Sequence, residues 1–409
     1  MQPDGVAGPH LTYCTNIHPG QTWATVRENF DRYVLPVREQ VAPGQRFGVG
    51  LRLSAEATET LREPEQLAAF RDFLRQHDLY VFTINGFPYG HFHGQPVKED
   101  VYLPNWMQPE RLTYTDALAT LLETLLPDGV KGTISTVPGA YAPLVASDED
   151  IERMVVQLAR HAGHLYGIRE RSGKEISLAL EPEPCCYLET VAQTVRFFER
   201  YLFGDRAVET LVNEVGVRRE DAEAILRRHL TVCFDACHMA VEFEEPREAL
   251  AAFRQAGIGI GKFQISAGLH VEFSGDRAGD AELRGHLERF ADPVYLHQVV
   301  ERRPDGQVRR YVDLPEALHA TADEHGPREW RIHFHVPLFR EELGVFQSTQ
   351  PYLRELIGLL KGGSAGQHWE VETYTWDVLP EEFRAGGVVT AVAREMQWVI
   401  DQMREARTA

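Results

Sequence analysis

The chain has 409 residues, 43% of them hydrophobic and 25% charged, which is the composition of a globular protein with a large core. Its formal net charge of −19 counts against nucleic acid as a partner, because binding to DNA or RNA normally needs clustered lysine and arginine side chains. No apolar run is long enough to span a membrane and the segment MQPDGVAGPH has no signal-peptide pattern, so we expect a cytoplasmic protein.

Short apolar segments alternate with amphipathic stretches, such as 23–41 and 148–166, along almost the whole chain. The expected strands are residues 10–18, 47–53, 79–86, 132–139, 176–184, 230–238, 260–268 and 368–376. This alternation implies a parallel sheet with helices on its outer face. Eight such units predict closure into a single (β/α)8 TIM-barrel domain over residues 1–409.

Three insertions interrupt this pattern, near residues 86–106, 204–229 and 270–330. The first is rich in glycine, proline and aromatic residues and follows the third strand, on the side where barrel active sites lie, so we expect it to cover a substrate. The third is expected to form a hairpin around residues 304–306, between strands seven and eight. The segment RIHFHVPLF, at 331–339, is a surplus strand in this scheme, or is itself the eighth barrel strand.

Large apolar residues alternate with small or polar ones in the later strands, as Leu178 and Leu180 do with Ala179 and Glu181. Because successive side chains of a strand point to opposite faces, the polar members share the inner face of the barrel. At the carboxyl ends of the eight strands the inward positions are all polar: Asn16, Arg52, Asn85, Ser135, Glu181, Asp235, Gln264 and Glu372. Carboxylates and amides gathered at one mouth predict a divalent-metal site.

The ends of the last four strands, LALEPEP, FDACH, KFQIS and VETYTW, resemble the xylose-isomerase-like superfamily of TIM barrels, which includes sugar isomerases, epimerases and endonuclease IV. That family takes one metal ligand from each of strands five to eight. The resemblance therefore implies four ligands: Glu181, Asp235, Gln264 and Glu372. It also implies that His238, in the Asp-x-x-His pattern, contacts the substrate or a second metal. Such an oxygen-rich set favours manganese or magnesium.

A narrower resemblance is carried by HLTYCTNIHPG, NGFPYGHFHG, HFHVP and EVETYTWDVLP, which are similar to segments of the EboE-type metabolite traffic proteins. Those proteins belong to a bacterial gene cluster associated with moving secondary-metabolite precursors to the periplasm. The resemblance implies partners among the other proteins of a metabolite-export pathway. It does not define a reaction.

Metal identity depends on two histidines, His333 and His335, whose spacing suits metal ligation. Some superfamily members bind additional zinc ions through an Asp-x-His pair between strands seven and eight, and this pair could take that part, which would favour zinc. The alternative is a pair of hydrogen-bonded inner-face histidines. Cys233 and Cys237 flank Asp235 and are interpreted either as small buried fillers or as thiolate ligands of zinc.

Several acidic residues leave alternatives open. Glu181 is interpreted as a metal ligand, with an ion pair to Arg52 or Lys262 as the alternative. Glu183 shares a strand face with Glu181, and Glu370 shares one with Glu372. Either residue of each pair could therefore contact the metal directly.

The predicted function is a metal-dependent sugar or polyol isomerase or epimerase acting on a small secondary-metabolite precursor. Glu181 and Glu372 are the candidate acid and base, and His238 would polarise or position an oxygen. The candidate substrate-binding residues are Asn16, Arg52, Asn85, His91, His93 and Lys262. The alternatives are a phosphodiester hydrolase similar to endonuclease IV, and a carrier or scaffold that binds a metabolite without turnover.

Overall fold

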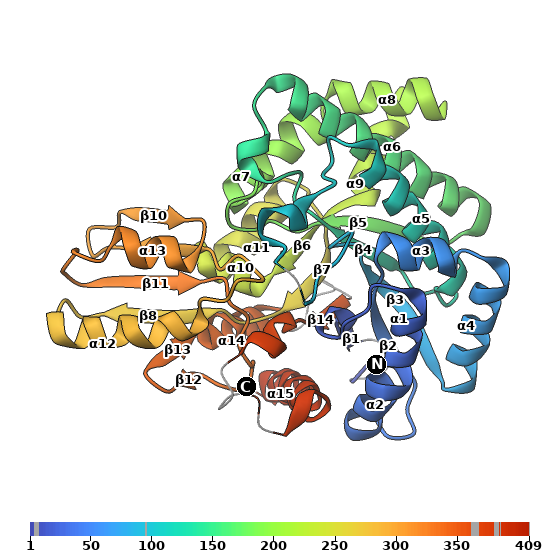
Figure 1. Cartoon of the computed structure of the whole chain (residues 1–409). Helices are drawn as coiled ribbons and strands as arrows, with labels where there is room; N and C mark the ends of the chain where they lie inside the picture. Colours follow the sequence, from blue (N-terminus) through green and yellow to red (C-terminus); the bar gives the residue numbers. More distant parts are fainter. Residues whose placement is uncertain (4–7, 95, 361–367, 380–383, 385, 409) are drawn as a thin grey trace.

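The computed structural model describes residues 1–3, 8–94, 96–360, 368–379, 384 and 386–408. Its centre is a parallel barrel with the strand order β1-β14-β7-β6-β5-β4-β3-β2 (Figure 1). The strands are β1 (His10–Tyr13), β2 (Phe47–Arg52), β3 (Leu79–Asn85), β4 (Gly132–Thr136), β5 (Ile176–Leu180), β6 (Leu230–Asp235), β7 (Ile260–Ile265) and β14 (His368–Val371). A parallel bridge between Cys14 and Gly50 joins the edges, so the barrel is nearly closed.

The eight predicted barrel strands are therefore all confirmed, although each is shorter than its sequence pattern. Asn16, Glu181 and Glu372 lie just after their strands, whereas the other polar residues of the mouth are the last or next-to-last residues of theirs. Most strand residues are buried on both faces, which is the expected result for a parallel sheet covered by helices.

Helices surround the barrel and connect its strands. They are α1 (Trp23–Asn29), α2 (Leu35–Val41), α3 (Ala55–Leu61), α4 (Pro64–Gln76), α5 (Pro109–Leu125), α6 (Asp148–Ser172), α7 (Val191–Phe197), α8 (Asp205–Val215), α9 (Arg219–His229), α10 (Ala236–Val241), α11 (Pro246–Gln255), α14 (Gln350–Leu359) and α15 (Gly387–Thr408). A π-helical stretch, Phe30–Val34, makes the predicted helix 23–41 continuous from α1 to α2. The predicted helical insertion at 204–229 forms α8 and α9. Among the residues described, no helix combines the length and apolarity needed to cross a bilayer.

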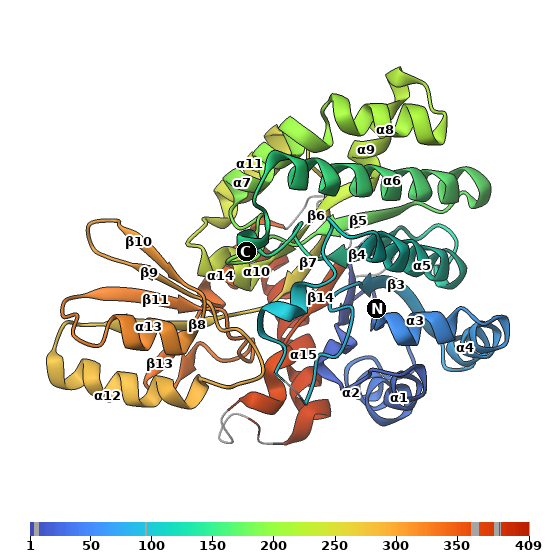
Figure 2. The same cartoon turned by 45° about the horizontal axis from the view of Figure 1, so that its top comes forward.

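A second, antiparallel sheet is inserted between β7 and β14 and stands beside the barrel (Figure 2). Its strand order is β10-β9-β11-β8-β13-β12. The strands are β8 (Leu269–Phe273), β9 (Val299–Arg302), β10 (Val308–Tyr311), β11 (Arg328–Ile332), β12 (Glu342–Leu343) and β13 (Phe346–Ser348), with α12 (Arg277–Leu287) and α13 (Leu314–Ala320) packed between them. The predicted hairpin around 304–306 is the β9–β10 turn, where Gly306 adopts a φ of +83°.

This sheet corrects two expectations. The insertion is larger than 270–330, since its strands begin at Leu269 and end at Ser348. The segment 331–339 is not a barrel strand, because β11 ends at Ile332 and pairs antiparallel with β8 and β9. The backbone then leaves the sheet and runs across the barrel mouth, so His333 and His335 lie on a loop and not on a strand.

Candidate functional site

Three carboxylates meet at the carboxyl ends of the barrel strands. Glu181 follows β5, Asp235 ends β6 and Glu372 follows β14, and one oxygen of each lies within 4.8 Å of the others. All three side chains are buried. Burial, followed by the nearby carboxylates, raises the pKa of Glu181 and of Glu372 well above the ordinary range. Three buried acids at this separation are the arrangement that a bound cation would stabilise.

The partners of these carboxylates leave specific oxygens available. Asp235 Oδ1 accepts hydrogen bonds from the His238 backbone N–H at 2.9 Å and from Ser266 Oγ at 2.7 Å. Asp235 Oδ2 is buried and has no hydrogen-bond partner among the described residues. Glu372 Oε1 accepts from the side-chain amides of Asn16, at 2.7 Å, and Asn85, at 3.2 Å. Asn16 and Asn85 thus orient a candidate metal ligand.

Gln264 lies at the end of β7, in register with Asp235 on one side and Glu370 on the other. It is fully buried, and within the described parts of the chain neither of its amide atoms makes a hydrogen bond. Leaving a buried amide unpaired costs about 1–3 kcal/mol. A metal beside Asp235 would give the amide oxygen of Gln264 a partner, so the residues present fit the predicted metal.

Three imidazoles lie next to the carboxylates, and each uses Nδ1 in the same way. His238 Nδ1 donates to the carbonyl of Pro182 at 2.9 Å, and His335 Nδ1 donates to the Glu372 carbonyl at 2.8 Å. His333 Nδ1 donates to Gln298 Oε1 at 2.8 Å. A neutral imidazole has one N–H, so these bonds leave the three Nε2 atoms as lone-pair donors. Oriented histidines of this kind are typical of metal sites.

The Nε2 atoms also lie close together. His238 Nε2 is 3.0 Å from His333 Nε2, and the His333 and His335 ring centres are 5.3 Å apart. Asp235, His238 and His335 form a second group whose ligand atoms lie within 4.8 Å of one another. The structure therefore brings His333 and His335, on the loop after β11, close to the predicted ligands at the ends of β6 and β14.

Two predicted substrate-binding cations are paired with protein groups outside this cluster. Lys262 is fully buried inside the barrel, where it pairs with Glu370 and donates to Ser135 Oγ at 3.2 Å. Burial by itself lowers the Lys262 pKa, but Glu370 outweighs it and leaves the pKa above its ordinary value. Arg52 donates to three backbone carbonyls, those of Gly20, Pro88 and Gly90. Both cations thus have structural partners in this state.

The loop after β3 covers the mouth of the barrel, as its composition predicted. The cavity beneath it is lined by Asn16, Asn85, Phe87, Pro88, Phe92, Val97, Lys98, Val101, Tyr102, Thr136, Val137, Pro138, Glu181, Glu183, His238, Tyr295, Leu296, His333, Glu372 and Tyr374. His93 anchors the loop, with Nε2 2.7 Å from the Asn16 carbonyl and Nδ1 3.1 Å from Tyr295 Oη. His91 is exposed and does not line the cavity.

A second anchor of this loop is Lys98, in the short helix Lys98–Tyr102. Its Nζ donates to Asp313 Oδ2 and to the Tyr295 carbonyl, each at 2.7 Å, and to the Asp292 carbonyl at 3.3 Å. All three partners belong to the inserted region. The insertion therefore helps to close the barrel mouth, a role that its sequence does not indicate.

A hydrogen-bond network at the cavity joins Tyr102 and Glu183, which the sequence pattern had brought out, to Gln298, which it had not. Tyr102 Oη donates to Glu183 Oε1 at 2.6 Å, and Gln298 Nε2 donates to Tyr102 Oη at 3.0 Å. This network places Glu183 at the cavity wall, and burial raises its pKa. Tyr374 also lines the cavity, and its place after Glu372 in VETYTW was a usable signal. Gln298 directly precedes β9 of the insertion and had no such signal.

Comparison with known proteins identifies the fold. No protein-family model and no curated protein matches the sequence. A xylose isomerase-like TIM-barrel protein from Mycobacterium smegmatis, solved with magnesium, has a TM-score of 0.53 and 11% identity over 99% of both chains. A xylose isomerase domain protein from Alicyclobacillus acidocaldarius gives 0.45 and 12% identity over 97% of this chain and 99% of its own. The likeness to the Mycobacterium smegmatis protein, together with the strand order, shows a TIM-barrel fold of the xylose isomerase-like kind.

Proposed function

We propose that this protein is a divalent-metal-dependent enzyme of the sugar isomerase or epimerase type, acting on a small hydroxylated compound. The observation that carries the proposal is the convergence of Glu181, Asp235 and Glu372, buried, beside the unpaired amide of Gln264. These four residues would hold the metal. When bound, it would supply a positive charge that polarises neighbouring substrate oxygens and stabilises the negative charge that develops when a proton is removed.

The chain's own groups can move the proton. Glu181 and Glu372 are the candidate acid and base, and burial raises the pKa of each. Asn16 and Asn85 fix the orientation of Glu372. Glu183 is a third carboxyl at the cavity wall, oriented by Tyr102. The covering loop limits access of water to these groups.

The ligand chemistry supports manganese or magnesium at the carboxylate centre. The magnesium in the Mycobacterium smegmatis barrel agrees with this assignment. The available Nε2 atoms of His238, His333 and His335 support further ligation by nitrogen, which would favour zinc at that side of the site.

The charges around the cavity support a neutral, hydroxylated substrate more than a phosphorylated one. Lys98 is the one lysine or arginine among the described lining residues, and its Nζ already contacts Asp313 and two carbonyls. The aromatic rings of Phe87, Tyr102 and Tyr141 form a stack, with ring centres 5.9 and 5.6 Å apart. A cavity lined by carboxyls and by aromatic rings suits a small polyol or hydroxycarbonyl compound.

We further propose an EboE-type role in metabolite traffic, with other proteins of an export pathway as partners. The segments that carry this resemblance lie around the site: 85–94 is part of the covering loop, 333–337 carries the two histidines, and 370–380 includes Glu372. We also propose that residues 1–409 form a single domain, because one hydrophobic core includes residues of both sheets, such as Phe263 and Trp330.

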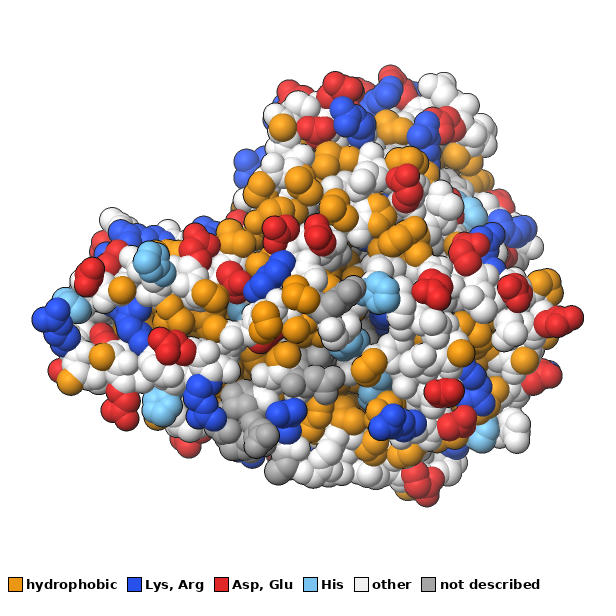
Figure 3. All heavy atoms as spheres, viewed as in Figure 1, with side chains coloured by type: hydrophobic (Ala, Val, Ile, Leu, Met, Phe, Trp, Pro, Cys, Tyr) orange, Lys and Arg blue, Asp and Glu red, His pale blue; other side chains and the backbone are white. Residues whose placement is uncertain are grey.

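The imidazole cluster favours one second candidate, a metal-dependent phosphodiester hydrolase. Lysine and arginine side chains are interspersed with acidic ones on the face seen in Figure 3, and the net charge is −19, so DNA is a poor substrate for it. A carrier without turnover is the third candidate, and the covered cavity is compatible with it.

One experiment separates these candidates. Metal-loaded protein is incubated in D2O with a panel of neutral aldoses, ketoses and cyclic polyols, and deuterium incorporation is followed by mass spectrometry. An isomerase or epimerase exchanges a carbon-bound proton, and Glu181→Gln or Glu372→Gln should abolish the exchange. Binding without exchange would identify a carrier, and cleavage of a model phosphodiester without exchange would identify a hydrolase.

A further inference from the structure

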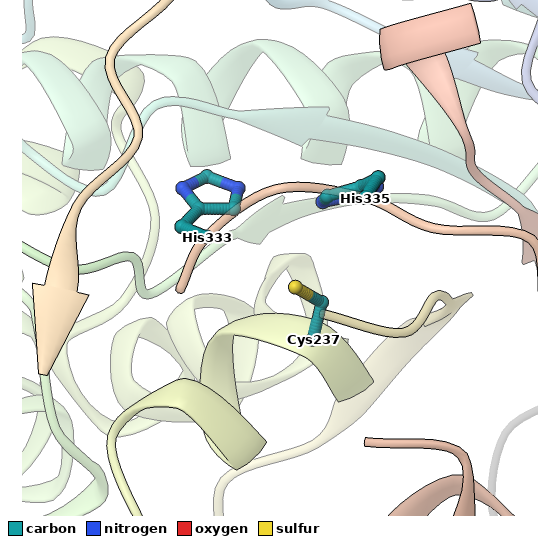
Figure 4. Close-up of side chains that lie close together, drawn as sticks. All are labelled: Cys237, His333 and His335. Atoms are coloured by element: carbon teal, nitrogen blue, oxygen red, sulfur yellow. The ribbon is translucent and has the colours of Figure 1, made fainter. Parts of the chain in front are cut away.

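A thiol lies beside the histidine cluster. Cys237 is the second residue of α10, is fully buried, and has its sulfur turned toward the space between His333 and His335 (Figure 4). The Cys237 sulfur and one ring nitrogen of each histidine all lie within 4.8 Å of one another. The three side chains come from α10 and from the loop after β11, so the tertiary fold alone brings them together.

An independent observation indicates that this group binds something. His335 is fully buried, its Nδ1 donates to the Glu372 carbonyl, and its Nε2 has no hydrogen-bond partner among the residues described. His333 Nε2 lies 3.0 Å from His238 Nε2 and 3.4 Å from Tyr374 Oη. Only the tyrosine hydroxyl can donate a proton to it when both rings are neutral. The cluster therefore has more lone pairs than hydrogens to satisfy them.

Packing alone does not account for this arrangement. Cys237 contacts Val241 and Val300, which is an ordinary environment for a buried cysteine. A small hydrophobic side chain would serve that purpose equally well. It would leave His335 Nε2 as a buried acceptor without a partner among the described residues.

We infer that Cys237, His333 and His335 form a soft-metal site that prefers zinc, distinct in its ligand chemistry from the carboxylate centre. Zinc binds thiolate at about 2.3 Å and imidazole at about 2.0–2.1 Å, so tetrahedral ligands lie about 3–4 Å apart. The three ligand atoms lie within 4.8 Å of one another, so they would move closer together on binding the metal. On binding, the Cys237 thiol releases its proton to solvent and the thiolate takes the metal.

Thiolate ligation makes the two centres selective for different ions. Sulfur and imidazole favour zinc, cobalt and copper over magnesium, whereas the oxygen set of Glu181, Asp235 and Glu372 favours magnesium or manganese. His335 also forms a ligand group with Asp235 and His238, and Asp235 belongs to the carboxylate centre, so the two centres adjoin. The inference shares the histidine ligation with the proposed function but does not require isomerase activity.

The test is the optical spectrum of the full-length protein, stripped with a chelator and loaded with cobalt(II). We expect a thiolate-to-cobalt charge-transfer band and the intense visible absorption of tetrahedral cobalt. Cys237→Ser should abolish the charge-transfer band and weaken zinc binding at least tenfold in a chelator competition. Cys233→Ser, which removes another fully buried thiol from the adjoining strand, should retain the band.

The outcomes distinguish this inference from the proposed function. Asp235→Asn should retain the band while losing manganese, since it alters the carboxylate centre. A wild-type spectrum without the band would overturn the thiolate site, whatever the behaviour of the variants. A band that persists in folded Cys237→Ser, or in Cys237→Ala if the serine variant does not fold, would overturn it as well. Loss of deuterium exchange with the band intact would count only against the isomerase proposal.

Discussion

His238 and His333 face each other through their Nε2 atoms, 3.0 Å apart, while both hold a proton on Nδ1. Two neutral imidazoles in this arrangement repel each other unless a proton or a metal lies between or beside the lone pairs. Burial, and then the neighbouring His238, lowers the pKa of His333 well below the ordinary range, which disfavours the proton. A metal cation bound beside the two Nε2 atoms would satisfy both lone pairs, which agrees with the proposed metal site.

Replacing Asp235 tests the carboxylate centre directly. Asp235→Asn retains the size of the side chain and the oxygen that caps α10, but removes a negative charge from the ligand set. We expect manganese affinity to fall about tenfold or more, because affinity depends on the number of charged oxygen ligands. Isothermal titration calorimetry and elemental analysis measure it. Asp280 is another buried acid, and Asp280→Asn should bind manganese as tightly as the wild type does. Equal manganese affinity in the Asp235 and Asp280 variants would exclude Asp235 as a ligand.

A Cβ at residue 50 should destabilise the barrel. At Gly50 an added Cβ would lie 1.7 Å from Glu370 Oε1 and 2.7 Å from the Tyr13 carbonyl. Gly50→Ala would therefore displace Glu370 from Lys262 and open the seam between β1 and β2. We expect a loss of about 2–3 kcal/mol in the free energy of unfolding by urea. In the control Gly358→Ala, the added Cβ has no atom within 4 Å. The same urea midpoint of unfolding in Gly50→Ala and Gly358→Ala would contradict the prediction.

Glu395 should make the stability depend on pH. It is buried, accepts hydrogen bonds from Thr373 Oγ1 and the Leu338 backbone N–H, and burial raises its pKa from 4.5 to about 7. The stability that its neutral form contributes is complete below pH 4.5 and is lost as pH rises through 7, a change of roughly 3 kcal/mol. Glu395→Gln should flatten this slope and be more stable than the wild type above pH 7.

Denaturant unfolding at several pH values measures this effect. Burial also raises the pKa of Glu242 to about 7. Glu242 contributes equally to the pH dependence of the wild type and of Glu395→Gln, so its effect cancels when the two are compared. Glu199→Gln, at an exposed position, is the matched control and should leave the slope unchanged. If the stability of Glu395→Gln depends on pH as strongly as that of the wild type, the Glu395 carboxyl is already ionised in the folded wild-type protein at acid pH.

Lys98 should hold the covering loop closed. Lys98→Ala removes the contacts to Asp313 and to the carbonyls of Asp292 and Tyr295. Hydrogen exchange across residues 86–106 should become faster, while global stability changes by less than about 1 kcal/mol, because a partly exposed ion pair contributes little. Lys131→Ala breaks the ion pair with Glu175 and should leave the loop unaffected. Exchange rates in 86–106 equal to those of the wild type would show that other contacts close the loop.

Local pattern was sufficient to predict the barrel and its carboxylates. Alternation with a period of two identifies a strand and its inward face, so Glu181, Asp235, Gln264 and Glu372 could be placed at one mouth before their distances were known. Side chains at the ends of parallel strands must meet there, whatever the helices outside do.

Contacts distant in sequence decided the rest. The sequence could not show that β11 pairs with β8 and β9, because antiparallel pairing over such a separation depends on the whole insertion; His333 and His335 were therefore assigned to a strand and lie on a loop. The partners of Arg52 and Lys262 were equally undetermined, since a buried charge is stabilised by whichever oxygens the fold brings to it. The sequence by itself determined which chemical groups reach the barrel mouth. Only the tertiary structure decided which imidazoles and which thiol face one another, because those distances depend on the packing of one sheet against the other.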